Sequence, residues 1–296
     1  MRRCRTAACG ILWMVSAQLL FAASWAVIKT LGRSLPVMEL VFFRGLASVI
    51  IITSYMKLRG MSLRGQNHTA LFLRALFGFV AMALSFYSMT KMKIGDASTL
   101  FNTLPIFVAL LAPAFLGERF SLGKLALVVV AFGGIGLILK PDTSLFEGAA
   151  AYALMAGFLG ALAMLCVRRM AASDSSLVIT LYFTGFTALC SAPFAFSRFK
   201  APTLEQWGLI AFIGVALTFG QILMVHAYKL GNASTIAPFS YASVIAAYFL
   251  GLLLFSEVPD LWSAMGAALV VGSGIGIMFT APTTEEREEM RSAKVT

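Results

Sequence analysis

Apolar stretches of about twenty residues follow one another along almost the whole chain, and they constrain its fold more than any other feature. A helix of that length spans the hydrocarbon core of a bilayer, which is about 30 Å thick. Only 12% of the residues are charged, against about 25% in soluble domains, so polar side chains are too few to cover a water-facing particle. We therefore predict an all-α integral membrane protein with about ten transmembrane helices. The predicted spans are 10–31, 36–56, 70–91, 97–117, 121–139, 148–170, 176–196, 206–228, 234–256 and 262–280.

Local signals mark the ends of these spans. Pro36, Pro141 and Pro202 stand between spans. Asp96 and Asn232 precede the fourth and ninth spans, where a short polar side chain commonly caps the first turn of a helix. We expect both to act as helix N-caps.

The distribution of positive charge predicts the orientation of the chain. With the N-terminus inside, the inner loops hold more than twice as many Lys and Arg residues as the outer loops, and such an excess marks the cytoplasmic side. An even number of spans agrees with two cytoplasmic termini. The net charge of +10 is therefore assigned to orientation in a cell inner membrane. It is not assigned to nucleic acid, because no basic arm or RNA-binding aromatic pattern accompanies it.

The sequence lacks the residue patterns of an enzyme, a metal site or a cofactor site. The four cysteines, Cys4, Cys9, Cys166 and Cys190, form no C-x-x-C pair, so neither a zinc site nor a disulfide framework is indicated. The glycine groups lack the spacing of a nucleotide fingerprint. The apolar run after the N-terminal arginines is too long for the apolar region of a signal peptide, so we expect it to be retained as the first helix.

An internal repeat organises the chain. Residues 95–100 (GDASTL) open the fourth span and residues 231–236 (GNASTI) open the ninth, each followed by a proline and then by an acid, Glu118 or Glu257. The two units are 1–141 and 142–282, followed by a charged cytoplasmic tail, 283–296. Since each unit has five spans, an odd number, the second must enter the membrane from the opposite side. We predict two inverted five-helix repeats, a frequent plan among secondary transporters.

Four motifs stand in order along the chain: residues 42–45 (FFRG), the opening of the fourth span with its close at Glu118, residues 139–141 (LKP), and the ninth span from residue 237 to 260. Together these motifs resemble those of the drug/metabolite transporter superfamily, specifically its ten-helix EamA-type members. The resemblance covers nearly the whole chain and implies a central cavity for a metabolite such as an amino acid, a nucleotide or a cofactor. The second repeat departs from the first at Thr184, which stands where symmetry would place Arg44.

Arg44 is the foremost candidate for contact with a substrate. It lies roughly 12 Å along its predicted helix, at about 1.5 Å per residue, and an arginine near the bilayer centre costs about 2.5–3.5 kcal/mol. It could clamp a carboxylate or a phosphate of the substrate through two parallel hydrogen bonds. It could equally form a structural pair with Glu39 or with free carbonyls of neighbouring helices. The sequence leaves both readings open.

Two other cations fall within spans. Lys29 is near the outer end of the first helix, one turn beyond Trp25, and Arg74 is near the inner end of the third. Long basic side chains near helix ends commonly extend to the lipid headgroups. We expect this of both, while Lys29 and Trp25 remain candidates for the substrate site.

Further polar and aromatic side chains within spans complete the candidate site. Pro105 and Pro238 each remove a helix hydrogen bond, so each is expected to kink its span, and carbonyls freed at such breaks can bind a solute. Alternatively, these side chains only hydrogen-bond between helices. The remaining candidates are Tyr87, Asn102, Thr184, Gln221, His226, Ser240 and Tyr241.

We therefore predict a secondary transporter that moves a small anionic or zwitterionic metabolite by alternating access, without a cofactor. No carboxylate lies near the middle of a span, and Glu118 and Glu257 are expected to cap helices or to take part in a gate. The alternative is a non-transporting scaffold or receptor in the membrane. Gly272 and Gly276 have the GxxxG spacing of closely packed membrane helices, so a homodimer through the glycine-rich fifth or tenth helix is a further prediction.

Overall fold

Helices account for all the regular secondary structure that is described. The computed structural model describes residues 2–116, 122–139, 149–170, 173–230 and 237–279. The first helices along the chain are α1 (Arg2–Leu31), α2 (Val37–Leu58), α3 (His68–Lys91), α4 (Ile94–Phe101), α5 (Leu104–Leu116) and α6 (Leu122–Leu139). The later ones are α7 (Ala149–Met170), α8 (Ser176–Ser197), α9 (Leu204–Leu230), the 3-10 helix η2 (Ala237–Tyr241), α11 (Ala242–Phe255) and α12 (Leu261–Phe279).

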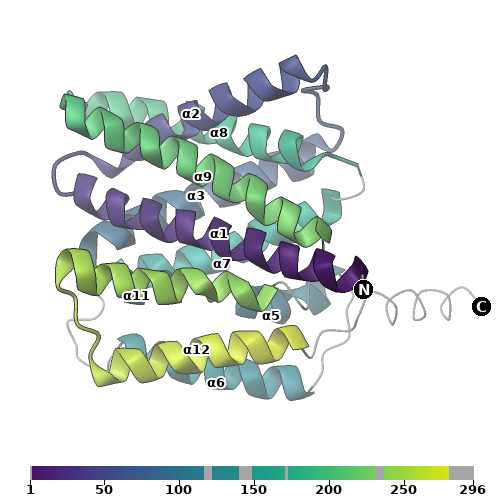
Figure 1. The fold of residues 1–296 in the computed structure, drawn as a ribbon, viewed down its shortest axis with the longest axis vertical. Helices are drawn as coiled ribbons and strands as arrows, with labels where there is room; N and C mark the ends of the chain where they lie inside the picture. The colour runs from purple at the N-terminus through teal and green to yellow at the C-terminus, as the bar shows by residue number, and fades with distance from the viewer. Residues whose placement is uncertain (1, 117–121, 140–148, 171–172, 231–236, 280–296) are drawn as a thin grey trace, which may run out of the picture.

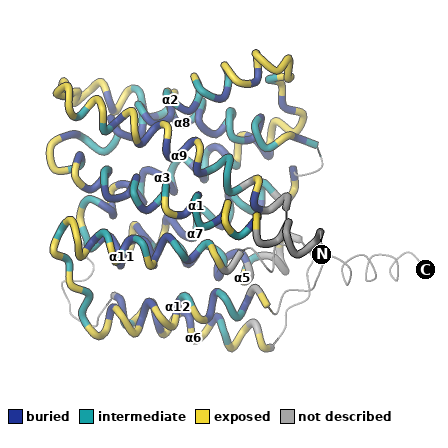
Figure 2. The backbone as a smooth tube through the Cα atoms, viewed as in Figure 1, coloured by how far each residue is buried: buried dark blue, intermediate teal, exposed yellow. Residues whose placement is uncertain are grey.

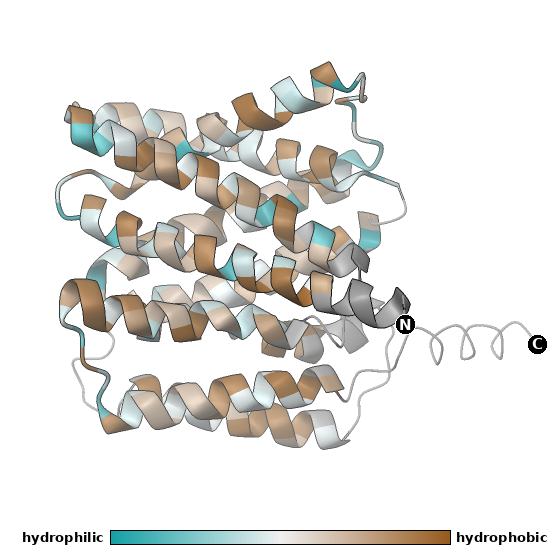
Figure 3. Ribbon diagram, in the orientation of Figure 1, coloured by the Kyte–Doolittle hydropathy of each residue, from teal (hydrophilic) through white to brown (hydrophobic). Residues whose placement is uncertain are grey.

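Several of these helices have the length and composition of membrane spans. Six of them contain apolar segments of 19 to 24 residues, and shorter apolar helices cover residues 125–138, 239–255 and 261–277. Apolar residues run along the helices and polar residues concentrate in the connections (Figure 3). Large apolar side chains also face outward: Leu189 is 74% exposed and Ile245 is 70% exposed. Such a surface suits lipid as its solvent, so the chain is a multi-pass membrane protein.

The fourth predicted span is broken in two. The break falls between Phe101 and Leu104, immediately before Pro105, which has no backbone N–H to continue the helix of α4. Polar side chains at the break donate additional hydrogen bonds to carbonyls of the last turn of α4. Asn102 Nδ2 donates to Ser98 O at 2.8 Å, and Thr103 Oγ1 donates to Leu100 O at 2.6 Å. The ninth predicted span likewise starts with the short helix η2, which contains Pro238, before α11.

Helices that are distant in sequence pack side by side. The most extensive pairs are α1 with α9, α2 with α8, α3 with α7 and α6 with α12, and α4 also packs against α11. Figure 1 shows them as one bundle in which α1 begins and α12 ends at the same end. Glycines allow close approach: a Cβ on Gly45 would lie 3.0 Å from the backbone nitrogen of Ala188 in α8. Buried positions line the helix faces that meet, and exposed positions line the outer faces of α6 and α12 (Figure 2).

One expected helix cap is wrong. The helix α4 starts at Ile94, with Lys93 as its N-cap residue, whose own side chain forms no capping hydrogen bond, so Asp96 lies inside the first turn. Its carboxylate instead accepts hydrogen bonds from Tyr248 at 2.7 Å and from Ser263 at 3.3 Å. A carboxylate buried between helices finds stronger donors there than in its own backbone. Asn232 lies outside the described residues.

Candidate functional site

Arg44 lies inside the bundle and has no acidic partner among the described residues. Its side chain on α2 is only 3% exposed, Nη1 donates to Met82 Sδ at 3.1 Å, and Nε has no hydrogen-bond partner. The alternative of a structural pair with Glu39 is wrong, because the Glu39 carboxylate accepts from the backbone N–H of Lys200 at 3.2 Å instead. The thioether of Met82 is a weak acceptor for a guanidinium.

Arg74 turns inward from α3, and the expectation that it reaches the headgroups is wrong. Its guanidinium carbon lies 4.4 Å from the centroid of the Phe183 ring, and that of Arg44 lies 5.4 Å from the same centroid. Nε of Arg74 is buried without a hydrogen-bond partner among the described residues. The inward path depends on Gly78, where an added Cβ would overlap Nη1 of Arg74. We call Arg44 and Arg74 the arginine pair.

Trp25 lies in the apolar cluster that the arginine pair adjoins. Its side chain on α1 is 7% exposed and meets Phe101 edge-on, with ring centroids 6.2 Å apart. Met82 and Phe183, the two residues that contact Arg44, belong to the same cluster. The structure therefore brings Met82 and Phe183 to Arg44 and places Trp25 in the same cluster.

Other predicted site residues are buried, but their contacts are local. Thr184 is fully buried, and its hydroxyl donates to Thr180 O, one turn back on α8, at 2.9 Å. Tyr241 is 2% exposed, and its hydroxyl has no hydrogen-bond partner within the described ranges. This hydroxyl lies against Gly274 of α12, where any Cβ would overlap it. Ser240 is half-buried in η2.

The remaining candidates do not gather at the arginine pair. Tyr87 is 39% exposed and packs edge-on against Tyr152 with centroids 5.4 Å apart. His226 is exposed on α9, with Nδ1 3.0 Å from Ile222 O. Gln221 is half-buried on the same helix.

Lys29 is also turned inward, so its expected extension to the headgroups is wrong as well. Its ammonium group forms an ion pair with Glu257, donates to Met92 O and lies 5.3 Å from the centroid of the Phe255 ring. The Lys29 side chain is 9% exposed and that of Glu257 is 16% exposed. This ion pair joins residues that are 228 positions apart in the chain.

Glu257 caps a helix, but not one that adjoins it in sequence. Its Oε2 accepts the backbone N–H of Ile94 at 2.9 Å, the first residue of α4, where a negative charge is favoured by the helix dipole. At the start of α12 the capping acid is Asp260, whose Oδ1 accepts from Ser263 N at 3.0 Å. We call the contacts of Lys29, Ile94 and Glu257 the Glu257 junction. Glu118, its counterpart in the sequence repeat, lies outside the described residues.

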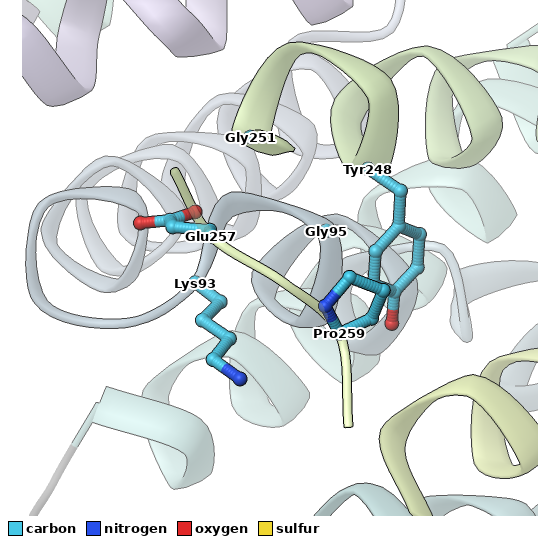
Figure 4. Close-up of a pocket in the computed structure, with 6 residues that line it drawn as sticks. All are labelled: Lys93, Gly95, Tyr248, Gly251, Glu257 and Pro259. Atoms are coloured by element: carbon cyan, nitrogen blue, oxygen red, sulfur yellow. The ribbon is translucent and has the colours of Figure 1, made fainter. Parts of the chain in front are cut away.

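A small pocket adjoins the Glu257 junction (Figure 4). It has an empty volume of about 150 Å³ and is lined by Lys93, Gly95, Tyr248, Gly251, Glu257 and Pro259. In Figure 4 the Lys93 side chain points away from the Glu257 carboxylate, and its ammonium group donates to Val258 O at 2.8 Å. Pockets for small-molecule ligands typically measure about 300–1,000 Å³. We therefore interpret this one as a crevice between packed helices.

A second polar contact joins two loops at the opposite end of the bundle. Asp174, before α8, accepts the backbone N–H groups of Gln66 at 2.7 Å and of Asn67 at 3.2 Å. The hydrogen bond from Gln66, followed by those from Ser173 and Asn67, holds the pKa of Asp174 below its usual value of 3.8. Asp174 therefore remains a carboxylate acceptor at neutral pH.

Sequence reasoning missed Phe183 and the inward path of Arg74. Residues 183–185 are only weakly similar to residues 43–45, and the repeat gives no reason for two arginines to contact one aromatic ring.

The described residues contain no group of three or more His, Cys, Asp and Glu side chains that could hold a metal ion.

Comparisons with known proteins agree with this architecture. The model of the EamA-like transporter family matches residues 8–140 and again residues 148–279. The pseudopaline exporter of Pseudomonas aeruginosa is 31% identical over 273 residues, which cover 92% of this chain and 96% of that protein. The S-adenosylmethionine uptake transporter of Rickettsia bellii is 26% identical over 281 residues, covering 93% and 95%.

The fold is also found in a solved structure. A protein of known crystal structure superposes with a TM-score of 0.66 at 17% identity, over 92% of this chain and 97% of that one. Two matches to one family model account for nearly all of the chain, and each named relative aligns with more than nine-tenths of it. The chain therefore belongs to the EamA-like transporter family of the drug/metabolite transporter superfamily, and it is a multi-pass membrane transporter of small molecules.

Proposed function

We propose that this protein carries a small anionic or zwitterionic metabolite across the inner membrane by alternating access, with Arg44 at the substrate site. The carrier consists of two inverted five-helix halves, residues 1–141 and 142–282, with both termini in the cytoplasm. Transport, and not a chemical reaction, is its activity. Trp25, which lies in the apolar cluster that Arg44 adjoins, is a further candidate for the site, and so are Tyr241 and Thr184.

The packing pattern supports two related halves. In the two halves α1 corresponds to α7, α2 to α8, α3 to α9, α4 to α11 and α6 to α12. Exchanging the halves therefore turns the contact of α3 with α7 into the contact of α9 with α1. The contacts of α2 with α8, α4 with α11 and α6 with α12 are unchanged by this exchange. All these contacts are observed, and the family model matches each half separately. Two halves of similar structure can exchange conformations of similar energy, which alternating access requires.

The single observation that carries the proposal is the burial of Arg44 without a carboxylate partner in the described part of the chain. A guanidinium inside a membrane protein is unfavourable unless it faces a partner or a cavity, and Met82 supplies only a weak acceptor. An anionic group on the substrate would complete the site through charge-assisted hydrogen bonds. The named relatives act on small organic metabolites, one as an exporter and one in uptake.

A thermal-stability screen of the purified protein tests this proposal. The library contains amino acids, nucleotides, cofactors and organic acids, and Arg44→Ala is screened beside the wild type. A ligand at 100 times its Kd stabilises the folded state by about 2.7 kcal/mol, which a melting curve detects. Arg59→Ala is the matched control, because Arg59 also lies over an aromatic ring, Tyr55, but is exposed at the end of α2.

We expect a ligand that raises the Tm of the wild type and of Arg59→Ala but not of Arg44→Ala. A ligand that stabilises all three equally would place Arg44 outside the site. If no member of the library stabilises the wild type, the alternative of a non-transporting scaffold or receptor gains support.

The glycine-rich helices α6 and α12 also bear on the proposed homodimer. Part of their glycine surface is used within the chain, since a Cβ on Gly134 would lie 2.7 Å from Gly266 O. A Cβ added at Gly133, Gly136 or Gly272 would meet no described atom of another segment within 4 Å. A dimer through this face remains a prediction. Cross-linking of single cysteines at positions 133 and 272 in native membranes tests it.

A further inference from the structure

We infer that Arg74 joins Arg44 in one site, and that this site takes a solute with two anionic groups, such as a dicarboxylate. This inference rests on the proposed function and narrows its substrate class. Sequence reasoning assigned Arg74 to the headgroup region and gave it no part in the site.

The two arginines reach one point from opposite directions along the bundle. Arg44 is about 10 Å from the start of α2 and Arg74 is about 9 Å from the start of α3, at about 1.5 Å per residue. The two helices start at opposite ends of the bundle. Both guanidinium carbons nevertheless lie within 5.4 Å of the Phe183 ring centroid. The side chains therefore converge on one ring instead of separating toward the two membrane surfaces.

Two like charges in this position call for negative charge that the described residues do not supply. Neither guanidinium forms an ion pair with a described carboxylate, and Nε of each is buried without a hydrogen-bond partner. The face of an aromatic ring attracts a cation only modestly. One carboxylate can hydrogen-bond to both guanidinium groups, but it neutralises only one of the two positive charges, whereas two anionic groups neutralise both. The arrangement therefore favours a solute with two negative charges over one with a single charge.

The surroundings of the pair fit a free solute better than a lipid headgroup. Arg74 is half-buried, but Arg44 is 3% exposed, which is too enclosed for a group that stays attached to the membrane surface. Met82 occupies the hydrogen-bonding position at Arg44 Nη1, and its flexible thioether side chain can move aside for a ligand. Gly78 leaves the space that Arg74 occupies.

Binding of matched acids tests the inference. The probes are straight-chain dicarboxylates from succinate to suberate, each paired with its own monoamide, which has the same length but one negative charge. Isothermal titration measures Kd for the wild type, Arg74→Gln, Arg74→Lys and the control Arg59→Gln. We expect at least one dicarboxylate to bind the wild type and Arg59→Gln about 10- to 100-fold more tightly than its monoamide, the range of one charged hydrogen-bonding partner.

In Arg74→Gln this preference should disappear while binding of the monoamide persists, and Arg74→Lys should restore part of it. If Arg74→Gln does not fold, Gly78→Ala replaces it, because the added methyl group would overlap the Arg74 guanidinium and displace it without removing its charge. The same methyl group would lie 2.9 Å from the Phe183 ring, so retained binding of the monoamide must show that the contact of this ring with Arg44 is intact. Gly78→Ala should reduce the preference for the dicarboxylate over its monoamide in the same way.

Equal binding of dicarboxylate and monoamide to the wild type would overturn the inference, and so would a preference that survives both Arg74→Gln and Gly78→Ala. The absence of binding by every dicarboxylate would overturn it too. If the thermal screen finds a ligand that depends on Arg44, none of these results contradicts the proposed function. If the screen finds no such ligand, both the proposed function and this inference lose their support.

Discussion

Two tyrosines in the helix bundle, Tyr248 half-buried and Tyr241 buried, differ in whether the hydroxyl has a hydrogen-bond partner. Tyr248 on α11 donates its hydroxyl to the Asp96 carboxylate at 2.7 Å, and its ring covers Gly95. Tyr241, two turns earlier, buries its hydroxyl without a described partner. A buried polar group without a partner is destabilising, whereas a hydrogen bond to a charged group stabilises.

Phenylalanine substitutions should separate these two cases. Tyr248→Phe is expected to lose roughly 1.5–3 kcal/mol, the contribution of a hydrogen bond to a charged group, and to lower the Tm in detergent. Tyr241→Phe should leave the Tm unchanged or raise it, because it removes a hydroxyl that has no acceptor among the described residues. A marked loss of stability in ligand-free Tyr241→Phe would show that this hydroxyl has a partner.

The sequence predicts whether a charged residue lies within a span better than it predicts the direction in which its side chain points. The depth of Arg44 along its span indicates a buried cation, and the structure confirms its burial. The expectations for Lys29 and Arg74 are wrong because a long side chain near a helix end can reach either the headgroups or the interior. The direction of each side chain depends on the residue that it contacts. Lys29 pairs with Glu257, far along the chain, and Arg74 lies over the ring of Phe183. Such neighbours follow from helix packing, which spacing along one chain does not reveal.

At the scale of the helices, the break between α4 and α5 is supported from outside. The glycine Gly157 of α7 lies against it, where a Cβ would be 2.7 Å from Thr103 Oγ1 and 3.0 Å from Leu100 O. Gly160, almost one turn later, meets only the end of the Leu104 side chain, at 2.8 Å. The helix α7 thus approaches the backbone of the break at Gly157, whereas at Gly160 it approaches a side chain that can move.

Alanine substitutions at these two glycines form a matched test of that contact. Gly160→Ala should leave stability unchanged or raise it by up to about 1 kcal/mol, the gain in helix propensity, because Leu104 can move. Gly157→Ala should lower it by roughly 1–3 kcal/mol, as overpacking does, because the backbone oxygen cannot move freely. Thermal melting of both variants in detergent measures the difference, and equal Tm values would contradict the close approach of α7.

The existence of the helices is predictable from the sequence, and their interruption is predictable only in part. Apolar stretches of membrane length indicate helices in the segments where the structure has them. Pro105 indicates a weak point, but it does not indicate that the Asn102 and Thr103 side chains turn back to hydrogen-bond with carbonyls of α4. The predicted start of the fourth span lies three residues after the observed start of α4, because the cap of α4 is the carboxylate of Glu257 from the other end of the chain.

At the scale of the whole molecule, polar contacts join the proposed halves at both ends of the bundle. The Glu257 junction connects α1 and α4 with the segment between α11 and α12. At the other end, Asp174 and Tyr182 hold the loop between α2 and α3. In a carrier that works by alternating access, such contacts must break in turn.

Loss of the Glu257 charge should open its end of the bundle more often. Glu257→Gln leaves Lys29 buried without its ion-pair partner, and breaking such a pair costs about 3–5 kcal/mol. Ala97 is fully buried in α4. In a background without the native cysteines, Ala97→Cys should therefore react faster with a membrane-impermeant maleimide once Glu257→Gln is added.

Glu205→Gln is the control for this experiment. Glu205 is an exposed acid in the first turn of α9, and that helix starts at the same end of the bundle. Labelling should be unaffected by its loss. Equal labelling rates in Glu257→Gln and Glu205→Gln would show that the Glu257 junction does not control access.

Counterflow in proteoliposomes tests the central claim, that this chain is a carrier with Arg44 at its substrate site. Vesicles are preloaded with an unlabelled amino acid, nucleotide, cofactor or organic acid, and entry of the same labelled solute is followed for the wild type, Arg44→Ala and Arg59→Ala. For at least one solute we predict saturable entry that preloading accelerates, retained in Arg59→Ala and lost in Arg44→Ala. Entry that rises linearly with concentration and ignores preloading, or no entry for any solute, would contradict a carrier, and accelerated entry that persists in Arg44→Ala would remove Arg44 from the site.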